Sequence, residues 1–196
     1  MAIKRKKAIV KEKTAIHESI IAAGFGGQGI MLLGKLIGLS AMNEGKEVTW
    51  ISSYGAEVRG GTAHSMVIIS SLPISSPTVK EPDTCIIMNV PSFIKFEKKI
   101  KKGGLIVVNS SIVKGNSKRK DIEILKVPAT DVAKKLGNVR VANMVMLGAY
   151  LKKRGFISIE TAISSLKEIF TSKDETVIEL NKLALKKGWE AAGGRG

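Results

Sequence analysis

Short apolar runs, separated by polar and glycine-rich segments, recur through the first two thirds of the chain. Runs of about four to eight apolar residues bounded by turn residues are typical of buried strands. The run at 62–70 begins by alternating and ends as a continuous apolar stretch, which also suits a strand. On this basis we predict strands at 19–24, 48–53, 62–70, 84–88, 105–109 and 122–127.

A second pattern, in which apolar residues recur every three or four positions, predicts helices. In the first of these segments the apolar positions include Ile30, Leu33 and Ile37, with small residues between them, and Gly45 follows as a stop signal. Ser158 has the side chain of an N-cap for the helix that starts beside it. The pattern predicts helices at 28–44, 92–99, 130–136, 141–153, 159–170 and 175–189.

Strands and helices alternate at first, and helices dominate the C-terminal third. This order predicts an α/β fold with a Rossmann-like open, mostly parallel sheet and helices on both faces. No internal repeat or low-complexity linker divides the sequence, so we expect a single domain at 19–190. We expect residues 1–18 to form a basic, flexible extension and residues 191–196 to form a flexible tail.

The composition changes this picture little and excludes several kinds of site. Of the 196 residues, 44% are hydrophobic and 25% are charged, as in ordinary globular domains. One cysteine, Cys85, cannot form an internal disulfide or hold an iron–sulfur cluster, and two histidines are too few for a usual His-based metal site. We see no apolar stretch long enough for a membrane span and no signal peptide, and therefore expect a cytoplasmic protein without a membrane partner.

The formal net charge of +15 favours acidic partners. Nucleic acid, a polyphosphate such as CoA, an acidic ferredoxin and an acidic partner subunit all meet that condition, and a lysine-rich solvated surface explains the charge equally well. Only 5% of the residues are aromatic, the charge is dispersed, and no recognised nucleic-acid-binding motif is present. We therefore do not predict nucleic acid as a partner.

A first glycine loop lies between the first predicted strand and the first predicted helix. Gly24, Gly26 and Gly29 form G-x-G-x-x-G, which in dinucleotide folds lets the backbone approach a phosphate at a helix N-terminus. The same glycines could instead only let the helix pack closely on the sheet, and both interpretations stay open. We expect Gly26→Val to damage folding or assembly more than any specific binding step, because a branched side chain in this turn would clash with the helix start.

A nicotinamide dinucleotide site also needs an acidic residue at the end of the second strand, where it holds the ribose hydroxyls. That strand ends in Ser52 and Ser53, whereas Glu47 lies at its start and Glu57 lies beyond it. A stand-alone Rossmann-type dinucleotide-binding oxidoreductase therefore remains only as an alternative.

A second glycine loop, YGAEVRGG at Tyr54–Gly61, follows the second strand. Arg59 offers a planar donor fork for phosphate or carboxylate, and Glu57 could orient it. Alternatively, the two residues pair with each other or with a neighbouring subunit, while Gly60 and Gly61 satisfy the turn. We expect this loop beside the first one at the C-terminal edge of the sheet, because both should follow neighbouring parallel strands.

These two loops together resemble the gamma subunit of 2-oxoacid:ferredoxin oxidoreductases. Further similar segments follow in order, including GGLIVVNS at 103–110 and NMVMLGA at 143–149, and the resemblance spans roughly residues 20–180. The patterns RGGT-x-x-S-x-V-I-I-S and PSFIKFE are closest to the 2-oxoglutarate type. The resemblance assigns a cofactor-binding or interface role to Gly24, Gly26, Gly27, Gln28, Gly29, Tyr54, Glu57, Arg59, Gly60, Gly61 and Asn143.

The resemblance implies a role within a multi-subunit enzyme. The whole enzyme would convert a 2-oxoacid and CoA to an acyl-CoA, CO2 and reduced ferredoxin. Thiamine diphosphate and the iron–sulfur clusters would be bound by the alpha, beta and ferredoxin-like subunits, with ferredoxin as the electron acceptor. This chain would bind no cofactor alone and would carry no catalytic residue, although it would help to form the CoA side of the site. We also expect it to expose an apolar patch, because its working surfaces would belong to the complex.

Overall fold

The computed structural model describes residues 15–54, 62–170 and 174–193. Within these ranges it confirms each predicted strand and helix to within a few residues, and Ser158 is an N-cap whose hydroxyl accepts the Thr161 N–H at 3.0 Å. The strands are β1 (His17–Phe25), β2 (Glu47–Tyr54), β3 (Thr62–Ser70), β4 (Thr84–Ile87), β5 (Leu105–Asn109) and β6 (Glu123–Val127). The helices are α1 (Ile30–Asn43), α2 (Val90–Glu97), α3 (Ala129–Lys135), α4 (Ala142–Arg154), α5 (Ile159–Ile169) and α6 (Glu175–Gly193).

The six strands form one sheet in the order β2-β3-β1-β4-β5-β6. The ladders β1–β4, β4–β5 and β5–β6 are parallel, whereas β3 is antiparallel to both β1 and β2. The expectation that β1 and β2 are neighbouring parallel strands was therefore wrong, because β3 lies between them. The short connection at 55–61 explains why β2 and β3 are antiparallel, since a parallel pair needs a crossover of about a dozen residues or more.

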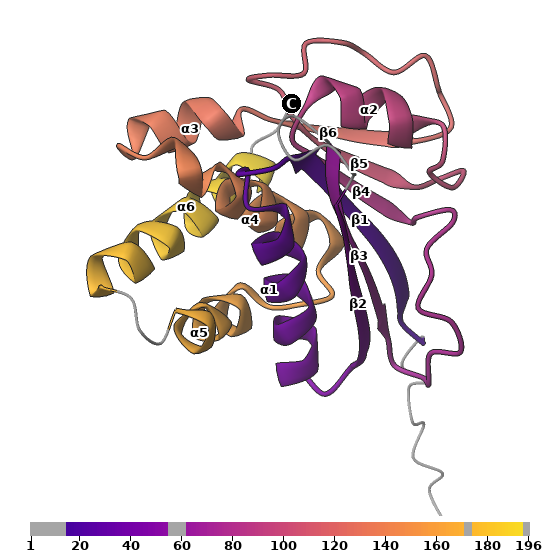
Figure 1. Cartoon of the computed structure of the whole chain (residues 1–196), viewed down its shortest axis with the longest axis horizontal. Coiled ribbons are helices and arrows are strands. Elements are labelled where there is room, and N and C mark those ends of the chain that lie inside the picture. The colour runs from indigo at the N-terminus through magenta and orange to yellow at the C-terminus, as the bar shows by residue number, and fades with distance from the viewer. Residues whose placement is uncertain (1–14, 55–61, 171–173, 194–196) are drawn as a thin grey trace, which may run out of the picture.

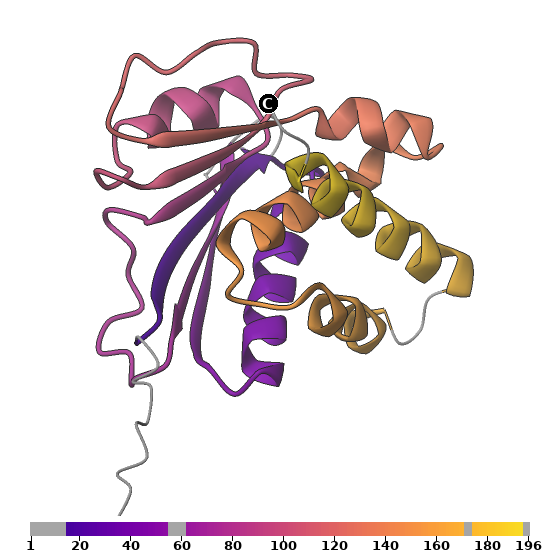
Figure 2. The ribbon, with the colours of Figure 1, turned by 180° about the vertical axis from the view of Figure 1, so that it is seen from behind.

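Helices cover the two faces of the sheet unequally (Figures 1 and 2). On one side α1 and α4 pack against the strands, and α3, α5 and α6 pack mainly on these two helices and on one another; the other side carries α2 together with the connections that flank it. Each face of the sheet has its own hydrophobic core, and β1 contributes to both because successive side chains point to opposite faces. Ile20 and Ala22 point to the five-helix side, and Ile21 and Ala23 point to the α2 side. The predicted fold class, an open and mostly parallel sheet with helices on both faces, is confirmed.

The central helix, α4, is buried from Ala142 to Leu151. A helix that is apolar on every side belongs in the interior. It crosses α6 so closely that a Cβ atom on Gly148 would lie 1.9 Å from the carbonyl oxygen of Leu185. This crossing therefore depends on glycine, and α4 has little freedom to shift.

Both predicted ends of the domain need correction. Glu18, assigned to the flexible extension, lies in β1 and is fully buried. Its carboxylate accepts hydrogen bonds from Arg154 Nε at 2.8 Å and from Thr84 Oγ1 at 2.6 Å. At the other end, α6 continues to Gly193, so residues 191–193, assigned to the flexible tail, are helical.

Candidate functional site

The carboxyl ends of the parallel strands meet at one edge of the sheet, and the first glycine loop lies there. The Phe25 carbonyl accepts the Gln28 N–H at 3.2 Å, which closes a tight turn. Gly27 has φ of 87° at the third position of this turn, where a side chain would be strained. Gly29, with φ of 71°, is the N-cap of α1. The turn therefore delivers the chain directly from β1 into the N-terminus of α1.

The glycines of this turn differ in how much space a side chain would have. A Cβ atom on Gly24 would lie 2.5 Å from Gln28 Oε1 and 2.9 Å from Met88 Cβ, and one on Gly29 would lie 2.3 Å from Asn143 Nδ2. A Cβ atom on Gly26 meets nothing within 4 Å. The expected clash at Gly26 was therefore wrong, because this residue stands at the open corner of the turn rather than against the helix start.

We expect Gly24→Val to destabilise the protein by about 1–3 kcal/mol, the usual result of overpacking. Gly26→Val should change stability by no more than about 0.5 kcal/mol, as for other substitutions in open space. For a chain of this size the first change should lower the Tm by roughly 3–10 °C, and the second by no more than about 2 °C. Thermal unfolding of the two variants beside the wild type tests this ordering, and equal losses would contradict it.

Gln28 and Asn143 hold the turn in place through their side-chain amides. Gln28 Oε1 accepts the Phe25 N–H at 2.7 Å, and its Nε2 lies 3.5 Å from the Met88 carbonyl at the end of β4. Asn143 Nδ2 donates to the Gly29 carbonyl at 3.2 Å, and its Oδ1 accepts the Met144 N–H at 2.9 Å. The two amides thus join the N-terminus of α1 to β4 and to the N-terminus of α4.

The second loop can be placed only at its start. Tyr54 is the last residue of β2, and its backbone pairs with Ala63, which pairs in turn with Gly24. The end of β2 therefore lies at the same sheet edge as the glycine turn, with β3 between them. The other predicted site residues of this loop, Glu57, Arg59, Gly60 and Gly61, lie outside the described residues.

Two hollows flank the glycine turn. One, of about 340 Å³, lies beside Gly26 and Ala63. The other, of about 240 Å³, lies between the turn and the starts of α3 and α4. The residues that line the second hollow are Gly27, Gln28, Met88, Ile112, Thr130, Val139, Arg140 and Ala142.

Two features of the second hollow favour an anion, whereas Asp131, next to Thr130 in the first turn of α3, adds a negative charge beside it. The first turns of α1 and α4 carry no acidic residue, so nothing on these helices neutralises the partial positive charge at their N-termini. Arg140 is exposed at the hollow and adds a guanidinium donor fork. Sequence reasoning missed Arg140, although it stands only three positions before the predicted residue Asn143. Its nearness to Gly27 arises from the packing of α1 against α4, which the sequence does not display.

His64 lies at the same sheet edge, on the α2 side, where its backbone pairs with Ala23. Burial lowers the pKa of its imidazole, and the charges of Lys95 and Lys99 lower it further. Its Nδ1 has no hydrogen-bond partner among the residues that the structure describes. The ring is therefore neutral at pH 7 and packs against Phe96, with ring centroids 5.6 Å apart.

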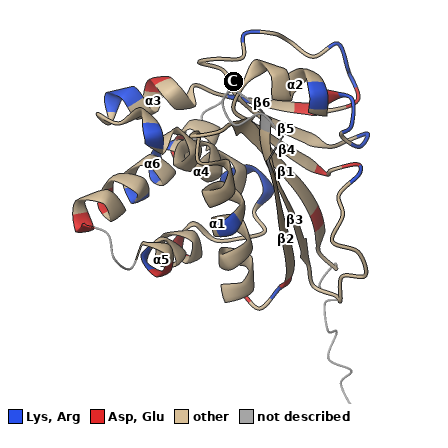
Figure 3. Cartoon of the chain, in the orientation of Figure 1, with Lys and Arg blue, Asp and Glu red and all other residues tan. Residues whose placement is uncertain are grey.

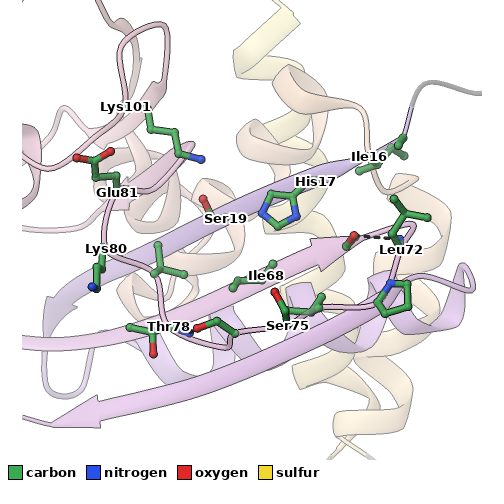
Figure 4. Close-up of a pocket in the computed structure, with 16 residues that line it drawn as sticks. Ile16, His17, Ser19, Ile68, Leu72, Ser75, Thr78, Lys80, Glu81 and Lys101 are labelled. Carbon is green, nitrogen blue, oxygen red and sulfur yellow. Dashed lines mark hydrogen bonds between the residues drawn. The ribbon is translucent and has the colours of Figure 1, made fainter.

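Other features are removed from this edge. A groove of about 450 Å³ lies at the opposite end of β1, beside His17 and Leu72, and it contains none of the predicted site residues (Figure 4). The Cys85 thiol is buried, and burial raises its pKa, so it is no nucleophile. Within residues 15–54, 62–170 and 174–193, no group of His, Cys, Asp and Glu could hold a metal ion. None of the helices in these ranges could cross a membrane.

The geometry does not favour the dinucleotide-binding alternative. In a Rossmann site the strand that carries the ribose-binding acid lies next to the first strand. Here β3 occupies that place, and β2 ends in Ser52 and Ser53 with Glu47 at its far end. On the other side of β1, β4 ends at Ile87 and is followed by Met88, again without a carboxylate.

Known proteins share this fold and are similar to the chain in sequence. Residues 19–191 match the family described as pyruvate ferredoxin/flavodoxin oxidoreductase. The 2-oxoglutarate synthase subunit KorC of Methanocaldococcus jannaschii is 36% identical over 93% of this chain and 97% of its own length.

Two solved structures superpose well on the chain. The gamma subunit of the keto/oxoacid ferredoxin oxidoreductase from Geobacter sulfurreducens PCA has a TM-score of 0.76 and 29% identity, over 89% of this chain and 98% of its own. A 2-oxoglutarate:ferredoxin oxidoreductase from Magnetococcus marinus has a TM-score of 0.85 and 27% identity, and this chain covers 32% of its length. The chain therefore belongs to the pyruvate ferredoxin/flavodoxin oxidoreductase family, as a gamma-type subunit of a 2-oxoacid:ferredoxin oxidoreductase.

Proposed function

We propose that the complex containing this chain oxidises 2-oxoglutarate in the presence of CoA to succinyl-CoA and CO2 and passes the electrons to ferredoxin. The observation that carries this choice of substrate is the 36% identity, over almost the whole of both chains, to a 2-oxoglutarate synthase subunit. The Magnetococcus structure, named as containing 2-oxoglutarate, CoA and succinyl-CoA, supports the same choice.

We infer that the redox cofactors are held by other chains. A single cysteine cannot ligate an iron–sulfur cluster, and that cysteine, Cys85, is buried. Thiamine diphosphate and the clusters are accordingly assigned to the alpha, beta and ferredoxin-like subunits, in a complex that works in the cytoplasm. The contribution of this chain is then to bind CoA and its partner subunits.

The glycine turn and Arg140 are the proposed phosphate-binding part of the CoA site. The N-terminus of α1 supplies backbone amides, the N-termini of α1 and α4 supply partial positive charge, and Arg140 supplies a guanidinium at the hollow between them. Gln28 and Asn143 keep the turn rigid, so that its amides need little rearrangement when a phosphate binds. We assign Tyr54, Glu57, Arg59, Gly60 and Gly61 to further contacts with CoA or with a partner subunit.

The substrate is tested with the complete complex, produced by co-expression of this chain with its partner subunits. A panel of 2-oxoglutarate, pyruvate, 2-oxoisovalerate and indolepyruvate is assayed with CoA and ferredoxin. We expect kcat/KM to be highest for 2-oxoglutarate. A higher kcat/KM for any other acid would reject the proposed substrate while leaving the family membership intact.

The role of Arg140 is tested in the same complex. Arg140→Ala should raise the KM for CoA by about tenfold, the loss expected for one hydrogen bond to a charged group, and should leave the KM for the 2-oxoacid unchanged. Lys134→Ala, which removes an exposed cation on nearby α3, is the matched control and should change neither constant. An unchanged KM for CoA in Arg140→Ala would remove this hollow from the CoA site.

A further inference from the structure

Helix α2 and the segment 110–122 enclose a groove of about 490 Å³ on the face opposite the five packed helices (Figures 1 and 2). Its apolar walls come from Val90, Phe93, Ile94 and Val113. Ile94 is 57% exposed and Val90 is 41% exposed, although both belong to a helix that otherwise packs on the sheet. Apolar side chains gathered in an open groove mark an interaction surface more often than a bare exterior.

The segment that forms the groove is rich in basic residues, of which Lys98, Lys118 and Arg119 line the groove, whereas Lys101 lies outside it and pairs with Asp83. The stretch 90–121 contains nine lysines and arginines and only two acidic residues. Figure 3 shows this excess as basic segments on α2 and on the connection that passes over it. The basic residues are Lys95, Lys98, Lys99, Lys101, Lys102, Lys114, Lys118, Arg119 and Lys120, and the acidic residues are Glu97 and Asp121.

Both acidic side chains are engaged within the groove wall. Glu97 accepts a hydrogen bond from the Ser117 hydroxyl. Asp121 accepts two from the Arg119 guanidinium, at 2.9 and 2.6 Å. Among the residues that the structure describes, Lys98 and Lys118, which line the rim of the groove, form no ion pair with these or other carboxylates.

The walls are held in a fixed position. Arg119 Nη1 donates to the carbonyl of Glu97 at 3.0 Å and to that of Ile100 at 2.7 Å, which fastens the segment to the end of α2. Phe93 and Val113 are buried beneath the groove and join it to the core of this face. The surface is therefore formed before any partner arrives, so binding requires little ordering of this chain.

We propose that this groove is the docking surface for an acidic segment of a partner subunit. An apolar side chain of that segment packs against the exposed side chains of Val90 and Ile94, and its carboxylates meet Lys98 and Lys118 at the rim. Charge complementarity selects an acidic partner, and the apolar walls select a protein. Phe93 is only 6% exposed and offers no ring on which a nucleic-acid base could stack. The proposal rests on the proposed function, which supplies the partner subunits.

The test measures the binding of the full-length chain to each purified partner subunit, thiamine-binding and ferredoxin-like. Ile94→Asp, and separately the double variant Lys98→Glu/Lys118→Glu, should each raise the Kd for one subunit by at least about tenfold, the scale of a single interface anchor. Binding of the wild type should weaken between about 0.05 and 0.5 M salt, as screening requires. The matched controls on exposed positions of α6, Leu183→Asp and Lys186→Glu/Lys187→Glu, should bind as the wild type does.

The binding measurements distinguish failure of the proposed function from failure of the docking surface. A wild-type chain that binds none of the subunits would reject the proposed function together with the docking surface. A wild-type chain that binds, with groove variants that bind equally well, would reject the docking surface alone. The double lysine variant replaces exposed side chains and keeps the fold, so it decides the matter even if Ile94→Asp disturbs α2. If only a labelled DNA duplex loses affinity on lysine reversal, the patch is a general polyanion surface and the proposal is overturned.

Discussion

Gly148→Val is expected to destabilise the chain severely. The added Cβ atom would lie 1.9 Å from the Leu185 carbonyl oxygen and 2.8 Å from the Trp189 backbone nitrogen. The reciprocal position on α6 is equally tight, since a Cβ atom on Gly188 would lie 1.8 Å from the Val145 carbonyl oxygen. These obstacles are helix backbone and cannot rotate away as a side chain does. The two helices would have to separate, and α4 is buried along nearly its whole length.

We expect a loss of more than about 3 kcal/mol, beyond the usual range for overpacking in a core. Helix propensity acts in the opposite direction, because valine is a better helix former than glycine, so a loss isolates the steric effect. Urea unfolding followed by circular dichroism measures the difference. Gly115→Val is the matched control, because a Cβ atom there meets nothing within 4 Å. Comparable stability of the Gly148 and Gly115 variants would show that α4 and α6 can move apart to accept a side chain at little cost.

Local pattern was sufficient to predict most of the elements but not their neighbours in the sheet. Buried strands such as β4 and β5 are continuous apolar runs in the sequence, and the helices show regular spacing of apolar positions. The short connection at 55–61 could have indicated the antiparallel β2–β3 pair, whereas the pairing of β3 with β1 is long-range and has no local signal. The order of the strands in the sheet could be determined only from the structure.

The candidate site was predicted in the same partial way. The glycine motif identified the turn and its place at the sheet edge, but not which glycines are confined. Gly29 is confined by Asn143, which is distant in the sequence, and Gly24 by Met88 as well as by its neighbours Gln28 and Ile30, whereas Gly26 is open. Arg140 joins the site only because η1 (Val139–Val141) brings the start of α4 beside the turn. A sequence motif indicates the local conformation of the backbone, whereas contacts between distant segments determine which other residues join the site and how much space each glycine has.

Arg154→Met is expected to destabilise the protein by about 3–5 kcal/mol, because it leaves a buried carboxylate without its charged partner. Glu18 is fully buried in β1, and Arg154 approaches it with both Nε and Nη2 from the end of α4. Thr84 Oγ1 donates to the same carboxylate at 2.6 Å but supplies no charge. Sequence reasoning placed Glu18 in a flexible extension because its partner lies 136 positions away.

A neighbouring ion pair provides the matched control for this prediction. Lys153 pairs with Glu123 at the surface, where the two side chains are 36% and 54% exposed. Lys153→Met should therefore cost no more than about 1 kcal/mol, the range of exposed pairs. The double variant Glu18→Gln/Arg154→Met should recover part of the loss, because it removes the unpaired charge along with the arginine. Urea unfolding of the three variants decides the matter: if Arg154→Met and Lys153→Met cost the same, the buried pair contributes no more than a surface pair and α4 is held to β1 by packing alone.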